Sequence, residues 1–167
     1  MRAPMGSAQP LRVAIYVRFS EAELQSGTSA TDQEHECRRF AESEGWEIVG
    51  LYADEGVRAG NMAGRLSYAR LREDARQGLF KAVLVWAVSR LSRRLLTGMR
   101  ELDELLGDGV IVLDTKGGKY SDDLNDLGRF FFEMYGAQKY TDDLAQNARR
   151  GLTGQVRRCL LYTSRCV

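Results

Sequence analysis

The sequence predicts an α/β fold with a central, mostly parallel sheet of about four to five strands, flanked by helices and followed by a long C-terminal helix. Two observations carry this prediction. Strand-like and helix-like segments alternate along residues 11–113, which favours parallel strands connected by helices. The run AVLVWAV at 82–88 is apolar throughout, as expected for a central strand that is covered on both faces.

The first three predicted elements follow from local patterns. Residues 13–17, VAIYV, are β-branched or aromatic and predict a buried strand. The stretch from Thr31 to Glu34, TDQE, fits a capping box and predicts the start of a helix that ends near Gly45. Residues 46–52 predict the second strand, and a glycine-rich loop follows it.

The next elements repeat this alternation. We expect a helix over residues 66–77, a strand over 81–88, a helix whose apolar face spans 95–106, and a strand over 110–113. Glycines follow both helices, at positions where a helix commonly ends.

One long helix is predicted after Asp122. Leu127, Phe131 and Met134 recur at helical spacing, and the aromatic residues 130–132 surround more than half of its circumference. A helix that is apolar on several sides must be buried on several sides. Either two of its faces pack on the same core, or one face meets a second protomer.

Composition narrows the class of protein. The 167 residues fit one domain, or one domain with an appendage, and the net charge of +1 gives no overall basic character. Cys37, Cys159 and Cys166 lack paired spacing and His35 is the single histidine, so we expect neither a metal nor a cofactor. Residues 1–10 indicate a disordered leader without a signal peptide; with no membrane-spanning run, we expect a cytoplasmic protein.

The C-terminal segment is basic. Four arginines lie there: Arg149, Arg150, Arg157 and Arg158. They form either a solvated tail or a surface that lies along a phosphate backbone. The last nine residues, CLLYTSRCV, continue no pattern, and we expect them to be non-native.

Side chains able to handle a phosphate follow the predicted strands. They are Arg18, Ser20, Arg65, Arg90 and Arg93. Alternation along an extended chain sends Arg18 and Ser20 to the same side, and the spacing of Arg90 and Arg93 puts them on one face if a helix has begun there. Several guanidiniums around one serine suit phosphoryl transfer, because they neutralise charge on the phosphate. The alternative is that these arginines pair with surface acids such as Asp54.

The motifs together resemble the catalytic domain of serine site-specific recombinases, the resolvase/invertase family, over roughly residues 11–151. The resemblance depends on the order and spacing of YVRFS at 16–20, Gln33, the DEG turn at 54–56, Arg65, and SRLSR at 89–93. The spacing is most similar to that of the large serine recombinases, the integrases and transposases of mobile elements.

The resemblance implies a mechanism and a role for each residue. Ser20 attacks a DNA phosphodiester and leaves a 5′-phosphoserine link and a free 3′-hydroxyl, without metal or ATP. Gln33 helps to orient the phosphate, and Asp54 supports the arginines. The residues that the resemblance implies hold the phosphate are Arg18, Arg65, Arg90 and Arg93.

The resemblance also implies partners and a domain layout. The partners are double-stranded DNA and further copies of the chain, as a dimer and as a tetramer during strand exchange, with no membrane and no small-molecule substrate. Residues 11–121 would be the catalytic core, 122–151 a dimerisation and linker helix ending in RRGL, and 152–167 a basic tail. The 16 residues after Gly151 show no DNA-binding motif, so we expect either an isolated catalytic domain or a fragment of a longer recombinase.

Two rival interpretations remain. At the position of Ser89 the family usually has an aspartate, which is a candidate proton donor to the leaving 3′-oxygen. A serine hydroxyl is a poorer general acid than a carboxyl group. The first rival is therefore a catalytically impaired, DNA-associated oligomerisation module of the same fold. The second is a flavodoxin-like phosphate binder, which needs a glycine-rich loop after the first strand, where this chain has Arg-Phe-Ser-Glu.

Overall fold

A computed structural model describes residues 9–18, 30–54, 65–92 and 94–163, with side chains omitted at residue 30 and at 157–163. Residues 1–8 of the leader predicted at 1–10, and the last four residues of the chain, lie outside the described part. The described chain forms one five-stranded sheet in the order β2-β1-β3-β4-β5.

The sheet is mostly parallel, as predicted. Strands β1 (Arg12–Arg18), β2 (Glu47–Asp54), β3 (Ala82–Val85) and β4 (Ile111–Asp114) are parallel to one another. The short strand β5 (Lys119–Tyr120) pairs antiparallel with β4. A tight turn between β4 and β5 reverses the chain, and its Gly117 has a φ of 83°, a value that favours glycine.

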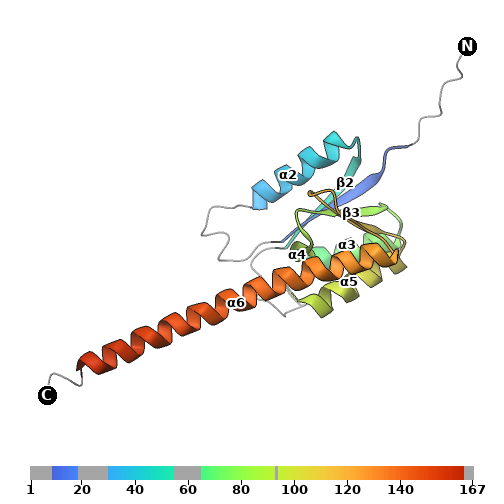
Figure 1. Cartoon of the computed structure of the whole chain (residues 1–167). Coiled ribbons are helices and arrows are strands. Elements are labelled where there is room, and N and C mark those ends of the chain that lie inside the picture. The colour runs from blue at the N-terminus through green and yellow to red at the C-terminus, as the bar shows by residue number, and fades with distance from the viewer. Residues whose placement is uncertain (1–8, 19–29, 55–64, 93, 164–167) are drawn as a thin grey trace, which may run out of the picture.

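Helices cover both faces of the sheet (Figure 1). Helix α2 (Ala30–Ser43) lies on one face, where Cys37 and Ala41 pack with Val13 and Ile15 of β1. Helices α3 (Leu66–Arg76), α5 (Leu95–Gly107) and α6 (Leu124–Thr163) lie on the other face. Alternate β1 residues such as Tyr16 point into that second core, so both faces of β1 are buried.

The strand predicted at 81–88 is shorter than expected. Strand β3 ends at Val85, and residues Val88–Leu91 form the short helix α4 instead. The sequence stays apolar past the end of β3 because Val88 and Leu91, which belong to helix α4, are also buried. An apolar run by itself does not distinguish a strand from a helix. Val85, the last residue of β3, pairs with Tyr16 of β1, so β1 continues two residues beyond the end of β3. Helix α4 packs beside this end of β1.

The prediction that Arg90 and Arg93 share one helix face stays untested, because Arg93 lies outside the described residues. Helix α4 ends at Leu91, and Ser92 is extended, with φ −144° and ψ 156°. Ser92 is buried, and the next helix begins only at Leu95. Helix α4 therefore carries Arg90 and ends one residue after it.

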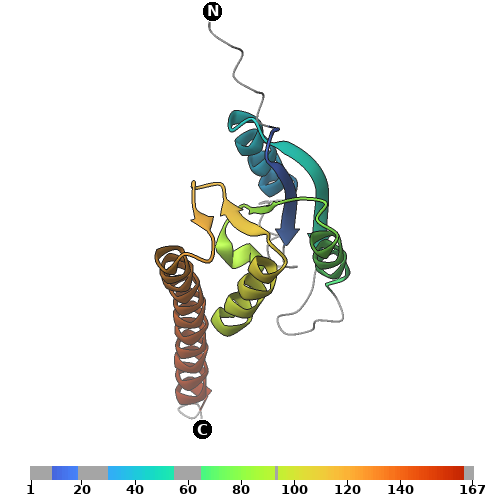
Figure 2. The same ribbon diagram turned by 90° about the vertical axis from the view of Figure 1, so that its right-hand side faces the viewer.

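Helix α6 is longer than predicted and continues beyond Leu152 to Thr163. Phe130 and Met134 are buried, whereas residues 139–156 are exposed, and the helix extends away from the sheet (Figures 1 and 2). Gly151 and Gly154 each cost a helix about 1 kcal/mol, but most residues around them favour helix. The two interpretations of this helix apply to different parts: its first turns pack on the core, and the rest is uncovered in the single chain.

Candidate active site

Two arginines bind the backbone of helix α4. Arg18, the last residue of β1, donates from Nε to the carbonyl oxygen of Arg90 (3.0 Å) and from Nη2 to that of Ser89 (2.8 Å). Arg65, just before α3, donates from Nη2 to the carbonyl oxygen of Leu91 (2.9 Å). Carbonyls at the end of a helix have no partner within it. Arg18 and Arg65 supply those partners and hold α4 at the carboxyl end of β1.

Arg65 is engaged on all three of its nitrogens. Its Nε and Nη2 donate to the hydroxyl of Tyr16 at 3.2 and 3.0 Å, and its Nη1 donates to the carboxylate of Glu101 on α5. The guanidinium carbon lies 4.1 Å from the ring centroid of Tyr68. With the bond to Leu91, at least four of its five N–H groups have acceptors, and the residue is buried.

Asp54 supports Arg65 through Tyr16. Its Oδ2 accepts the Tyr16 hydroxyl at 2.9 Å, and that hydroxyl in turn accepts from Arg65. The same carboxylate accepts the backbone N–H groups of Ser67 (2.9 Å) and Tyr68 (3.1 Å), so Asp54 also caps the first turn of α3. A chain of polar contacts thus runs from β2 through Tyr16 and Arg65 to α5.

Burial is the largest single influence on the pKa values of Tyr16, Arg65 and Glu101, which belong to this series of polar contacts. It raises the pKa of Glu101, even though the neighbouring Arg65 opposes the shift. Burial also raises the pKa of the Tyr16 hydroxyl, which therefore stays protonated and continues to donate to Asp54. For Arg65, burial acts to lower the pKa, but Tyr16 and Glu101 outweigh it, so the pKa is raised and the guanidinium stays charged.

The other predicted residues are placed only in part. Gln33 lies on α2, is 1 % exposed, and has no hydrogen-bond partner for its amide within the described residues. Ser89 and Arg90 are half-buried on α4, and the Arg90 guanidinium carbon lies 5.2 Å from the ring centroid of Trp86. The nucleophile candidate Ser20 and Arg93 lie outside the described residues.

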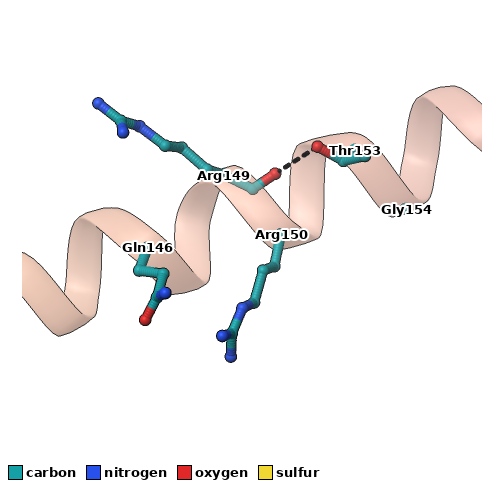
Figure 3. A pocket seen from close by; sticks show the side chains of 5 residues that line it. All are labelled: Gln146, Arg149, Arg150, Thr153 and Gly154. Atoms are coloured by element: carbon teal, nitrogen blue, oxygen red, sulfur yellow. Dashed lines mark hydrogen bonds between the residues drawn. The ribbon is translucent and has the colours of Figure 1, made fainter.

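The candidate DNA-binding arginines lie on the distal half of α6. Arg149 and Arg150 are exposed and project from different sides of the helix (Figure 3). They line a shallow recess with Gln146, Thr153 and Gly154, and the Thr153 hydroxyl donates to the Arg149 carbonyl at 2.9 Å. The backbone of Arg157 and Arg158 continues the same helix.

The described part of the chain contains neither a cluster of metal-ligating side chains nor a membrane-spanning helix. No three His, Cys, Asp or Glu residues in it gather closely enough to hold a metal ion. None of its helices combines the length and apolar character needed to cross a membrane.

The sequence matches a family model described as "Resolvase, N terminal domain" over residues 13–158. The chain belongs to this family. A curated relative named "Putative DNA recombinase" from Bacillus subtilis (strain 168) is 36% identical over 126 residues, 75% of this chain and 24% of the relative. The chain therefore spans about a quarter of that relative's length.

Solved structures of the family share the fold. A resolvase family site-specific recombinase from Streptococcus pneumoniae superposes with a TM-score of 0.62 and 25% identity, over 88% of this chain and 99% of that one. The N-terminal catalytic domain of TP901-1 integrase gives a TM-score of 0.60 and 24% identity, over 80% and 98% of the two chains. The family match, the curated relative and the Streptococcus pneumoniae structure identify the chain as the catalytic domain of a serine site-specific DNA recombinase.

Two residues of the site, Tyr16 and Glu101, were not predicted from the sequence. The sequence predicts Tyr16 only as an aromatic residue of the first strand, whereas in the structure its hydroxyl links Asp54 to Arg65. Glu101 had a detectable signal: it shares a face of α5 with the buried Gly98 and Leu105. A carboxylate at a core-facing helix position needs a buried partner, and that partner is Arg65.

Proposed function

We propose that this chain cuts and rejoins DNA through a 5′-phosphoserine intermediate. The Ser20 oxygen forms a bond to phosphorus while the bond to the 3′-oxygen breaks; the serine loses a proton and the departing 3′-oxygen gains one. Rejoining reverses these steps. Because one phosphoester replaces another, the exchange needs no external energy source.

One observation carries this proposal: Arg18 and Arg65 converge on three consecutive carbonyls of the turn that bears Arg90. Guanidiniums from β1, from the start of α3 and from α4 are thereby brought to the carboxyl ends of neighbouring strands, where ligands of α/β sheets bind. Such a group suits the charge that develops on a phosphate during transfer.

We assign the remaining residues as follows. Arg93 joins the three arginines in holding the scissile phosphate, and Gln33, whose amide has no partner among the described residues, helps to orient it. Asp54 acts through Tyr16 on Arg65. The proton transfer that aspartate usually serves in the family falls to the position of Ser89.

We further propose that the reaction uses several copies of the chain on double-stranded DNA in the cytoplasm. Large apolar side chains stand exposed along α6, among them Phe132 (71%) and Tyr140 (67%), which supports burial against another copy. Arg149 and Arg150 lie further along the same helix, followed by Arg157 and Arg158, and would meet the phosphate backbone beyond that contact.

A covalent-trapping experiment tests the proposed function. The whole chain is fused through its C-terminus to a DNA-binding domain of known site, mixed with a nicked substrate, and separated on a denaturing gel. We expect a protein–DNA adduct that is absent from Ser20→Ala. A Ser89→Asp fusion runs in parallel.

The outcomes separate the alternatives. An adduct formed by the native fusion and lost in Ser20→Ala supports the proposed reaction. An adduct formed only with Ser89→Asp supports the impaired-module interpretation, with proton transfer at that position as the defect. No adduct from any fusion, with site binding demonstrated, contradicts the proposal.

A further inference from the structure

Glu101 is a buried carboxylate with one hydrogen-bond partner, Arg65, among the described residues. The residue is 1 % exposed, one carboxylate oxygen accepts from Arg65, and Oε2 has no hydrogen-bond partner within the described residues. Removing a carboxylate from water is costly, and a single partner compensates it incompletely. A leucine or methionine at this position of α5 would avoid the cost, so the charge calls for another explanation.

Two groups of ion pairs join the α3 region to the α5 region, one centred on Arg72 of α3 and one on Arg65 just before α3, and their side chains differ in burial. Arg72 pairs with Glu104 and Asp108, and the Glu104 side chain is 44% exposed. In the Arg65–Glu101 pair the side chains are 8% and 2% exposed. Arg72 donates to Glu104 and Asp108, whereas Arg65 also reaches the α4 backbone at Leu91. Glu101 is therefore the buried carboxylate in contact with an arginine that holds α4.

We propose that Glu101 is a positioning residue for DNA cleavage: its carboxylate holds the Arg65 guanidinium against α4 and so fixes where α4 presents Arg90. This inference rests on the proposed function. Helix α4 has only four residues and no side-chain hydrogen bond at its N-cap, so the groups that bind its carbonyls contribute to fixing its position, together with the packing of Val88 and Leu91. Hydrogen bonds to an ionised carboxylate are about twice as strong as neutral ones, so the charge strengthens this anchor.

The pKa of Glu101 agrees with a role beyond stability. Because burial raises that pKa, folding favours the neutral form, and the charged form is kept at some expense of the free energy of unfolding. The charged and titratable groups that influence Glu101 are Arg65 and Tyr68 from the α3 region, Arg18 from β1, and Arg100 on α5 itself. Three of these are cations, yet burial still dominates.

The first test follows α4 without any chemistry. Trp86 lies beside Arg90, and Trp46 is the only other tryptophan, so Trp46→Phe leaves Trp86 as the sole indole. A cation over an indole ring perturbs its emission. We expect Glu101→Gln to change the intensity or lifetime of Trp86 emission in this background. The matched control, Glu104→Gln, removes a carboxylate from the neighbouring ion-pair group and should leave the emission as it is.

The second test uses the trapping assay with the whole-chain fusion. Glu101→Gln is expected to slow adduct formation about ten- to a hundredfold, the range seen when a reacting group is displaced by about 1 Å. Glu101→Gln leaves the buried Arg65 guanidinium without its ionic partner, so we expect a lower urea-unfolding midpoint at pH 7, with the variant folded and its site affinity unchanged under the assay conditions. Glu104→Gln should form the adduct at the native rate. If the Glu101→Gln variant does not fold, Glu101→Asp, which keeps the charge on a shorter arm, replaces it in both tests.

Several results would overturn the inference. Unchanged Trp86 emission together with a native adduct rate in Glu101→Gln shows that the carboxylate does not position α4. A faster adduct rate shows that Glu101 restrains Arg65 rather than aiding it. If the native fusion binds its site and forms no adduct, the proposed function fails, and Trp86 emission still decides whether Glu101 holds α4.

Discussion

At the scale of single residues, Arg65 connects the parts of the candidate site. Its guanidinium reaches the Tyr16 hydroxyl on β1, the Leu91 carbonyl on α4 and the Glu101 carboxylate on α5. A planar group with five donors can serve three acceptors in fixed directions, which a lysine ammonium cannot reproduce. The orientation of each of these elements therefore depends on the same side chain.

Glu101 leads to a prediction about pH. Its folded-state pKa is raised, so the folded protein binds this proton more tightly than the unfolded chain does. The resulting stability is fully present below the ordinary pKa of a glutamate and is lost as pH rises through the folded-state pKa. We expect the free energy of unfolding of the native chain to decline over this interval relative to that of Glu101→Gln, in urea titrations between about pH 4 and pH 8.

The control for this comparison is Glu104→Gln, which leaves Glu101 in place. Its free energy of unfolding should decline with rising pH as that of the native chain does. Parallel pH curves for the native chain and Glu101→Gln would contradict the prediction, because they would show that Glu101 binds its proton equally in both states.

At the scale of elements, α5 and α6 approach closely at Gly98. A Cβ built on Gly98 would lie 2.7 Å from Met134 Cε and 3.3 Å from Ser92 Cβ. Met134 is buried on α6, and Ser92 is the extended residue after α4. Three segments therefore meet closely at Gly98, and an added Cβ requires the buried Met134 side chain and Ser92 to shift.

We expect Gly98→Ala to lower the free energy of unfolding by about 1 kcal/mol, measured by urea denaturation. The overpacking penalty of about 1–3 kcal/mol exceeds the roughly 1 kcal/mol that alanine gains in a helix. The control is Gly136→Ala, on the exposed side of α6, where nothing lies within 4 Å of the added Cβ. It should raise the free energy of unfolding by about 0.5–1 kcal/mol. Equal effects of the two substitutions would refute close packing at Gly98.

At the scale of the whole molecule, the chain has a packed α/β body and a helix that extends beyond it (Figure 2). The body buries its apolar side chains on both faces of the sheet, whereas α6 leaves several of its own exposed. Exposed apolar residues along one helix are more typical of an interface than of a monomer's surface.

Self-association through α6 is the corresponding prediction. We expect the native chain to associate in a concentration-dependent way in sedimentation experiments. Phe132→Ser should raise the dissociation constant about tenfold or more, because a large buried aromatic side chain commonly dominates an interface. Lys139→Ser, on the same helix, should leave it nearly unchanged. A native chain that stays monomeric at all concentrations would refute this prediction.

Local sequence patterns determined most of the fold. The alternation of apolar runs and helical periodicity was sufficient for the parallel sheet, the flanking helices and the long C-terminal helix, because burial on a given face imposes a fixed period on the chain. The motifs likewise singled out Arg18, Arg65 and Arg90, and the structure brings the first two to the carbonyls of the turn that bears Arg90. Their role in holding a phosphate stays a prediction.

Only the tertiary structure decided how these parts meet. The sequence does not show that β3 stops at Val85, because that end depends on α4 packing beside β1. Nor does it show that Arg65 pairs with Glu101, since the partners lie 36 residues apart and meet only when α5 packs on the sheet. Periodicity reports which side of an element is buried; it carries no information on which buried group faces which, and that choice rests on three-dimensional packing.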